Sequence, residues 1–248
     1  MPIWRYIPPI SASGSLQMAI DQWLLDQHRQ GHPPTLRFYT WEPAAISLGY
    51  HQRRWPAHWN HLTWNDRPLD LVRRPTGGRA VLHQGDLTYA VITSGLTGDR
   101  TQNYHQLCEF LLRGWRSLGV ELHYGQAGRG YIQNPNCFGT ATGADLLLPE
   151  GFKLIGSAQL YREQTILQHG SMRLKPNPEL FQQVFQENLL LPVFAGGLEW
   201  IVPETIMTAL KDALIQTFAI ELVEQPLSQQ EWQSIVAQLP PDENDSVS

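Results

Sequence analysis

A thiol, an amine and a group of small residues lie close together in the second half of the chain. Residues 136–174 read NCFGTATGADLLLPEGFKLIGSAQLYREQTILQHGSMRL, with Cys137 near the start and Lys153 near the middle. A thiol can carry an acyl group, an amine can serve as a cation or a base, and small residues leave room for a chain. The segment therefore indicates acyl transfer. The further residues that we expect to line its site are Gly156, Ser157, Ala158, Gln159, His169 and Gly170.

A second segment upstream, residues 72–83, carries arginines, glycines and a histidine in the order VRRPTGGRAVLH. Glycines let a backbone approach a ligand and expose N–H groups, and arginines hold anionic or carbonyl groups. The alternative is a tight hairpin with a solvated arginine pair. No P-loop pattern is present. The candidate binding residues of this segment are Arg73, Arg74, Thr76, Gly77, Gly78, Arg79 and His83.

Each reactive residue of the second half has a structural alternative. Cys137 lies in a loop-like stretch rich in Gly, Asn and Pro, where catalytic groups concentrate, with Lys153 and His169 as possible activators. A lone cysteine is otherwise a small buried hydrophobe, as we expect for Cys108 in a helical run. Lys153 could be an edge-strand lysine that opposes aggregation, and His169 a sheet histidine with satisfied hydrogen bonds.

Hydrophobic spacing and capping residues predict the elements that position these groups. Helices are expected at 13–30, 103–118, 178–187, 203–218 and 229–239. Strands are expected at 4–7, 35–40, 44–50, 69–74, 80–83, 87–93, 120–124, 144–148, 152–159, 165–174 and 220–224. We expect the strands 80–83 and 87–93 to pair, and the segment 144–174 to form a three-stranded meander. The order indicates an α+β fold with a central, mainly antiparallel sheet flanked by helices, which would cover one face.

Composition bounds the class of protein. At 248 residues, with 42% hydrophobic residues, the chain fits a single catalytic domain over 1–240, followed by a disordered tail at 241–248. A net charge of −5 argues against nucleic acid as the main partner. No signal peptide and no apolar run of membrane-spanning length is visible, so we expect a cytoplasmic protein with no membrane partner. Two cysteines make no disulfide framework, and no apolar surface stripe stands out, so we expect a monomer.

Five segments together resemble a known family. They are RFYTWEPAAISLGYHQ (37–52), VRRPTGGRAVLH (72–83), LTYAV (87–91), NCF (136–138) and FKLIGSAQLYREQTILQHGS (152–171). In this order they resemble the lipoate/octanoate attachment family, which is related to biotin–protein ligases, over roughly residues 3–175. Within it the chain is most similar to the lipoate-ligase-like octanoyl-acyl-carrier-protein:protein N-octanoyltransferases.

The resemblance implies a tunnel for an eight-carbon chain and assigns roles to individual residues. Cys137 matches the acyl-carrying cysteine, and Lys153 matches the lysine that contacts the acyl carbonyl. Arg74, Gly77, Gly78 and His83 would border the same pocket. The stretch 139–150 departs from the family, because 142–145 reads TGAD where an aromatic-acidic pair is usual, which leaves the pocket shape and chain-length preference open.

The resemblance also implies two successive transfers. The Cys137 thiolate would take the octanoyl group from octanoyl-acyl-carrier protein, and a lysine of a lipoyl-domain protein, such as the glycine cleavage H protein, would then take it as an amide. Thioester exchange is nearly balanced and amide formation runs downhill, so no cofactor, metal or ATP is expected. Because both protein substrates are typically acidic, the arginines near the glycine pair would help them dock.

Three alternatives differ in class or in chemistry. A lipoate–protein ligase would use ATP and Mg²⁺ and would not need Cys137. It classically carries an accessory domain, for which we expect the residues after about 200 to be too few. A biotin ligase has less support, because residues 128–130 (GRG) are only a fragment of its glycine-rich loop. A non-catalytic acyl-binding protein would show no hydroxylamine-sensitive acyl group on Cys137.

Overall fold

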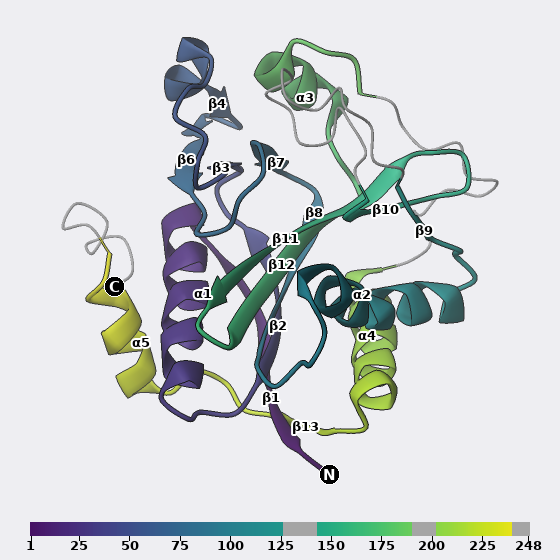
Figure 1. Cartoon of the computed structure of the whole chain (residues 1–248). Helices are drawn as coiled ribbons and strands as arrows, with labels where there is room; N and C mark the ends of the chain where they lie inside the picture. The colour runs from purple at the N-terminus through teal and green to yellow at the C-terminus, as the bar shows by residue number, and fades with distance from the viewer. Residues whose placement is uncertain (126–142, 190–201, 240–248) are drawn as a thin grey trace.

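An eight-stranded mixed sheet runs through the centre of the protein, as the computed structural model in Figure 1 shows. The structure describes residues 1–125, 143–189 and 202–239. From one edge to the other the strands are β13 (Glu221–Glu224), β1 (Ile3–Ala12), β2 (Thr35–Trp41), β8 (Asp86–Thr93), β12 (Thr165–Arg173), β11 (Lys153–Arg162), β10 (Asp145–Leu147) and β9 (His123–Tyr124). Only β1 pairs in parallel, with β13 and β2, so the prediction of a mainly antiparallel sheet is confirmed.

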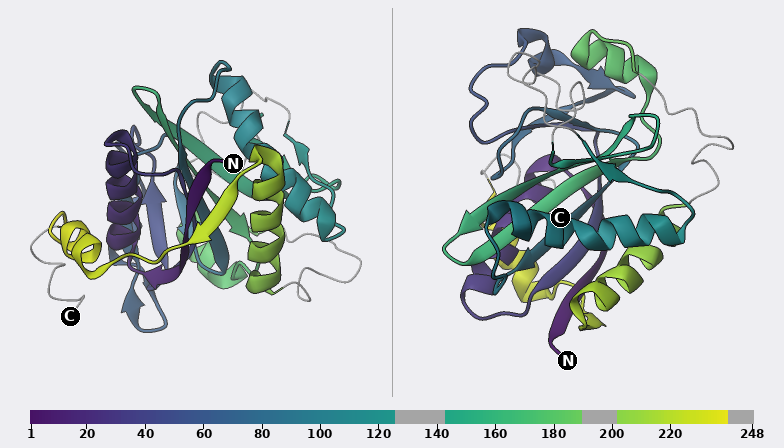
Figure 2. Two further views of the ribbon diagram at one scale, coloured as in Figure 1. Left: turned by 90° about the horizontal axis from the view of Figure 1, so that it is seen from below. Right: turned by 45° about the vertical axis from the view of Figure 1, so that its right-hand side comes forward.

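Helices cover both faces of this sheet (Figure 2). One face carries α1 (Gly14–Arg29) and α5 (Gln229–Val236), and the other carries α2 (Arg100–Ser117) and α4 (Pro203–Phe218). The expectation of a single covered face was wrong, because β8 is buried along its whole length. Its Tyr89 and Val91 join the core beneath α2 and α4, whereas Ala90 and Ile92 join the core beneath α1.

A small three-stranded sheet lies beside the main one, in the order β6 (Asp70–Arg73), β3 (Ala45–Leu48), β7 (Val81–His83). It packs with the 3₁₀ helix η1 (Ala57–His61) and α3 (Pro178–Phe185), and a short ribbon of β4 (Thr63–Trp64) and β5 (Arg67–Pro68) follows η1. The predicted pairing of 80–83 with 87–93 was wrong, because β7 pairs with β3 and both edges of β8 are occupied by β2 and β12.

The same topology corrects the alternative reading of residues 73–83 as a tight hairpin. The central strand β3 pairs in parallel with β6 and antiparallel with β7, so it separates the two strands that would have formed the hairpin. The connection 74–80 must therefore pass from one side of β3 to the other. This crossing carries the glycine pair over the junction of the two sheets.

Local signals fix the starts of the helices α1 and α2 and the strands β10, β11 and β12, which carry Lys153 and His169. Ser13 caps α1 by accepting a hydrogen bond from the Leu16 N–H at 3.4 Å. Asp99 and Gln102 form a capping box that starts α2 three residues before the predicted helix. The predicted meander is confirmed, with β11 paired antiparallel to both β10 and β12.

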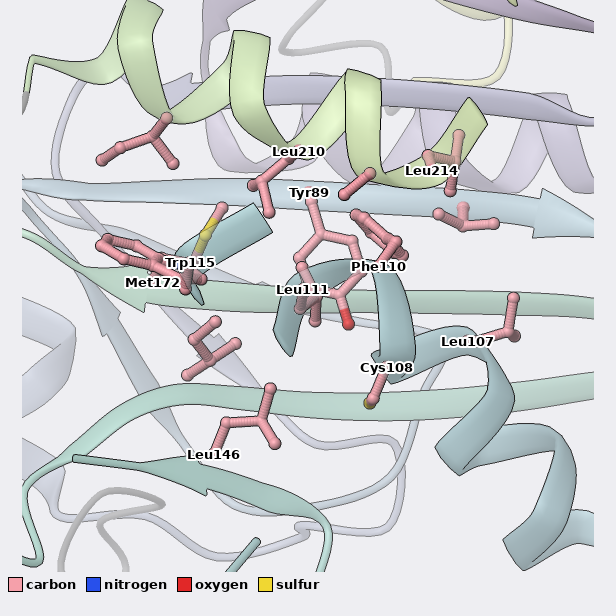
Figure 3. Packing of buried hydrophobic residues seen from close by; sticks show 14 of the residues in the cluster. Tyr89, Leu107, Cys108, Phe110, Leu111, Trp115, Leu146, Met172, Leu210 and Leu214 are labelled. Atoms are coloured by element: carbon pink, nitrogen blue, oxygen red, sulfur yellow. The ribbon is translucent and has the colours of Figure 1, made fainter. Parts of the chain in front are cut away.

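The larger core lies between the sheet and the helices α2 and α4 (Figure 3). Cys108 is fully buried there, as predicted, and desolvation raises the pKa of its thiol to about 12. A thiol with such a pKa stays protonated at neutral pH and is a poor nucleophile. Within residues 1–125, 143–189 and 202–239, no helix combines the length and apolar composition that a membrane crossing requires.

The close approach of α2 to α4 at Gly114 gives a test of the packing. A Cβ atom at this position would lie 2.6 Å from Leu210 Cδ2 and 3.1 Å from Leu210 Cα. Glycine to alanine in a helix ordinarily stabilises by about 1 kcal/mol, but overpacking costs about 1–3 kcal/mol. We expect Gly114→Ala to lower the free energy of unfolding in urea by about 1 kcal/mol. The exposed Gln106→Ala is the matched control, with a change within about 0.5 kcal/mol. A stabilised Gly114→Ala protein would contradict this packing.

Candidate active site

A pocket lies where the connection 74–80 meets the main sheet. Two of its walls come from β11 and β12, and Met18, Tyr39, Trp41 and Val81 supply large apolar surface. The predicted site residues that line it are Arg74, Gly77, Gly78, His83, Gly156, Ser157, Ala158, His169 and Gly170. The fold thus brings two segments about 80 residues apart in the sequence to one cavity.

Other predicted residues lie behind the lining or away from it. The Thr76 hydroxyl lies 2.6 Å from His169 Nε2, and the Arg79 carbonyl accepts a hydrogen bond from Arg74. Gln159 donates to Gln168 at 2.7 Å, and the exposed Arg73 donates to backbone carbonyls of residues 49–52. These four residues shape or flank the pocket without lining it.

Arg74 holds the crossing connection in place. Its guanidinium is buried and donates to the carbonyls of Ser47 at 2.7 Å, Gly77 at 2.9 Å and Arg79 at 2.6 Å. Gly78 has a φ of +94°, and a Cβ there would lie 2.7 Å from Arg74 Nη2, so only glycine fits without strain. The alternative of a solvated arginine pair is therefore wrong for Arg74.

His83 lies between a carboxylate and a hydroxyl. Its Nδ1 is 2.8 Å from Asp86 Oδ2, and its Nε2 is 2.8 Å from Ser47 Oγ. Burial lowers the His83 pKa more than the Asp86 carboxylate raises it, and Arg74 lowers it further. The ring is therefore neutral at pH 7. Its partners assign the tautomer, in which Nδ1–H donates to Asp86 and Nε2 accepts the Ser47 hydroxyl proton.

His169 lies in a second arrangement of the same kind. Its Nδ1 is 2.8 Å from Asp21 Oδ2, and its Nε2 faces Thr76 Oγ1. Asp21 is fully buried, accepts the Tyr39 hydroxyl at 3.0 Å and pairs with the equally buried Arg37 at 3.3 Å. The histidine is thus a sheet histidine with satisfied hydrogen bonds that also forms part of the pocket wall.

Lys153 forms a buried ion pair and does not line the pocket. Its strand β11 lies between β12 and β10, so the edge-strand alternative is wrong. Its Nζ is 2.8 Å from Asp145 Oδ1, and both side chains are at most 5% exposed. A buried ammonium requires such a partner, because desolvation of a lone charge costs several kcal/mol. Cys137 lies in 126–142, outside the described residues.

Four residues of the site were not predicted from the sequence: the carboxylates Asp21, Asp86 and Asp145, and Ser47. A signal was present for two of them. Ser47 is the one polar residue in the strand AISL, and Asp21 lies on the apolar face of its helix. A polar residue inside an apolar pattern requires a buried hydrogen-bond partner, which sequence spacing alone does not identify. Among the described residues, no three His, Cys, Asp or Glu side chains are grouped to hold a metal ion.

Comparisons with known proteins agree with this architecture. The family model for the lipoyl protein ligase A/B catalytic domain matches residues 13–230. The octanoyltransferase LipM of Lysinibacillus sphaericus (strain C3-41) is 34% identical over an alignment of 263 positions, which covers 96% of this chain and 95% of that protein. LipM of Kyrpidia tusciae (strain DSM 2912 / NBRC 15312 / T2) is 38% identical over 190 residues, covering 72% and 69%.

The fold is also found among solved structures. One is of an archaeal lipoylation system, a bi-partite lipoate protein ligase and its E2 lipoyl domain from Thermoplasma acidophilum. Its matching chain gives a TM-score of 0.72 at 19% identity, with 99% of this chain and 92% of that chain covered. At this identity the similarity establishes the fold alone.

The buried, neutral His83 gives a pH test of the site. Because its pKa is lowered in the folded protein, the unfolded chain, with a histidine pKa of about 6.5, binds more protons just below neutral pH. The free energy of unfolding should therefore fall as pH decreases from about 7 towards the folded-state pKa. We expect His83→Gln to reduce this fall in denaturant titrations between about pH 7.5 and 5, and the exposed His51→Gln to serve as control. If the free energy of unfolding of His83→Gln fell with decreasing pH as steeply as that of the unmodified protein, the ring of His83 would not be buried in its neutral form.

Proposed function

The chain belongs to the lipoyl protein ligase A/B catalytic-domain family, and from this premise we propose that it transfers octanoyl groups by way of Cys137. The donor would be octanoyl-acyl-carrier protein and the acceptor a lysine of a lipoyl-domain protein, in lipoate biosynthesis. The observation that carries the proposal is the relation to an octanoyltransferase over 96% of the chain, at 34% identity.

The pocket supports an acyl substrate. Its large apolar side chains offer surface to an alkyl chain, and its small residues on β11 and β12 leave space beside them. Burial of each methylene contributes about 0.8 kcal/mol, so an eight-carbon chain could gain several kcal/mol. Gly170 has no room for a side chain, because a Cβ there would lie 2.4 Å from Ser157 Oγ and 2.9 Å from the Gly156 carbonyl.

The reaction needs two exchanges at one carbonyl carbon. In the first, the Cys137 thiolate attacks the donor thioester, a new C–S bond forms, and the carrier thiol leaves. In the second, the amine of the acceptor lysine attacks, and the Cys137 sulfur leaves. The acyl group arrives already activated as a thioester, so neither exchange requires ATP.

Lys153 does not line the pocket, but it lies on β11 three residues before Gly156, which does. We propose that its ammonium stabilises the negative charge that develops on the carbonyl oxygen. Its pairing with Asp145 holds the ammonium at a fixed place on β11. A preorganised cation near a developing oxyanion stabilises the transition state, because little reorganisation is needed when the charge appears. Asp145 would then act as a positioning residue for Lys153, within the segment 142–145 that departs from the family pattern.

Basic surface near the pocket suits acidic protein substrates. Arg53, Arg54 and Arg73 are exposed in or beside the segment that leads to the connection 74–80. Such a group of cations would attract an acidic carrier protein or lipoyl domain and accelerate the encounter. The glycine cleavage H protein is our proposed example of the acceptor. We also propose that the enzyme acts as a monomer in the cytoplasm.

Intact mass spectrometry tests the acyl-enzyme. After incubation with octanoyl-acyl-carrier protein and no ATP, the unmodified enzyme should gain one octanoyl group that hydroxylamine removes, because it is a thioester. Cys137→Ala should gain none. Cys108→Ala is the matched control and should still be acylated, since the Cys108 thiol is buried with a pKa raised to about 12. Absence of the adduct, with transfer that requires lipoate and ATP, would identify a ligase instead.

A further inference from the structure

The second transfer requires a base. A lysine amine has an ordinary pKa of about 10.4, so the acceptor arrives mainly as an ammonium. The nitrogen must lose protons to attack and to become an amide, and general base catalysis of such steps contributes about 10²–10⁴-fold. Among the described residues that line the pocket, the imidazoles of His83 and His169 are the candidate proton acceptors.

The two histidines differ in what they present to the pocket. In the arrangement of His83, the hydroxyl on Nε2 belongs to Ser47, which itself lines the pocket. In the arrangement of His169, the hydroxyl on Nε2 belongs to Thr76, which lies behind the lining. A hydrogen-bonded path from the pocket to a ring nitrogen therefore exists for His83.

The Ser47 hydroxyl has room for one more proton donor. Its own proton points to His83 Nε2, and one lone pair accepts from Arg74 Nη1 at 3.2 Å. A hydroxyl oxygen has two lone pairs, so the second can accept a hydrogen bond from an amine in the pocket. This count fits a relay, in which the oxygen takes one proton as it releases another.

The far end of the path is held in place by several donors. Asp86 Oδ2 accepts the Nδ1 proton of His83 at 2.8 Å, the Ser171 hydroxyl at 2.6 Å and the Thr88 hydroxyl at 3.2 Å. The ring of Trp41 stacks on the His83 imidazole, with the two ring centroids 3.8 Å apart, and so fixes the orientation of the imidazole. A carboxylate on Nδ1 fixes the tautomer that leaves Nε2 as the proton acceptor.

We propose that Ser47, His83 and Asp86 form a proton relay that takes the proton of the attacking lysine amine during transfer of the octanoyl group. The inference rests on the proposed function. Ser47 contacts the amine, and His83 and Asp86 act through Ser47.

The step balances in atoms and electrons. The acceptor ammonium first gives one proton to solvent. The neutral amine nitrogen then forms a bond to the carbonyl carbon, and the C–S bond breaks with its electron pair leaving on sulfur. The surplus amine proton moves to Ser47 Oγ while the Ser47 proton moves to His83 Nε2. The Asp86 carboxylate stabilises the resulting imidazolium, whereas Arg74 and His169 disfavour its positive charge. Return of the proton to the released thiolate restores the relay.

Single-turnover kinetics separates this relay from the rest of the reaction. The octanoyl-enzyme is formed with octanoyl-acyl-carrier protein, isolated, and mixed with an unmodified lipoyl domain at a series of pH values. We expect Ser47→Ala to slow the second transfer, relative to acylation, by about 100-fold. His83→Asn keeps polar groups but cannot take up a proton, and it should do the same. Ser47→Thr, which keeps the hydroxyl, should restore the rate.

The pH profile identifies proton transfer, which a purely structural role would not. As pH decreases, the rate of the second transfer by the unmodified enzyme should fall more steeply once His83 becomes protonated. This change of slope, the break in the pH profile, should disappear in Ser47→Ala. Ser234→Ala is the control, because it removes an exposed hydroxyl on α5 that does not line the pocket, and it should keep the break. Second-transfer rates in Ser47→Ala within threefold of the unmodified enzyme, or an unaltered break, would overturn the relay. Absence of any octanoyl-enzyme from unmodified protein would instead refute the proposed function.

Discussion

Two buried carboxylates, Asp21 and Asp86, hold the layers of this protein together at the pocket. A carboxylate removed from water must receive hydrogen bonds or opposite charge, and an unpaired one would cost several kcal/mol. Asp21 of α1 is satisfied by Arg37 and Tyr39 of β2 and by a histidine of β12. Asp86 is satisfied by side chains of β7, β8 and β12. The need to satisfy two anions thus fixes the relative positions of a helix and four strands.

The chemistry of the pocket follows from the same constraint. Each carboxylate holds one imidazole by Nδ1, which leaves Nε2 directed at a hydroxyl. Trp41 links the His83–Asp86 arrangement to the apolar side chains of the pocket, because its indole N–H donates to Thr88 while its ring stacks on His83. The pocket therefore combines a rigid polar side with large apolar side chains, as transfer of an alkyl thioester requires.

The sequence predicted what depends on near neighbours. Ser13 and the spacing of apolar residues after it predicted α1, and the short turns between β10, β11 and β12 predicted the meander. The failures depend on distant pairing. Nothing local indicates that β3 separates β6 from β7. Asp145 and Asp86 were missed for the same reason, since only the folded sheets show which side chains they satisfy.

The claim that this pocket holds the acyl group is tested most directly by a crystal structure of the enzyme after reaction with octanoyl-acyl-carrier protein. The alkyl chain should lie against Met18 and Trp41, with the connection 74–80 over it and the carbonyl end towards Ser47 and His83. An octanoyl group bound elsewhere, with the pocket between β11, β12 and residues 74–80 unchanged, would contradict the assignment of the site.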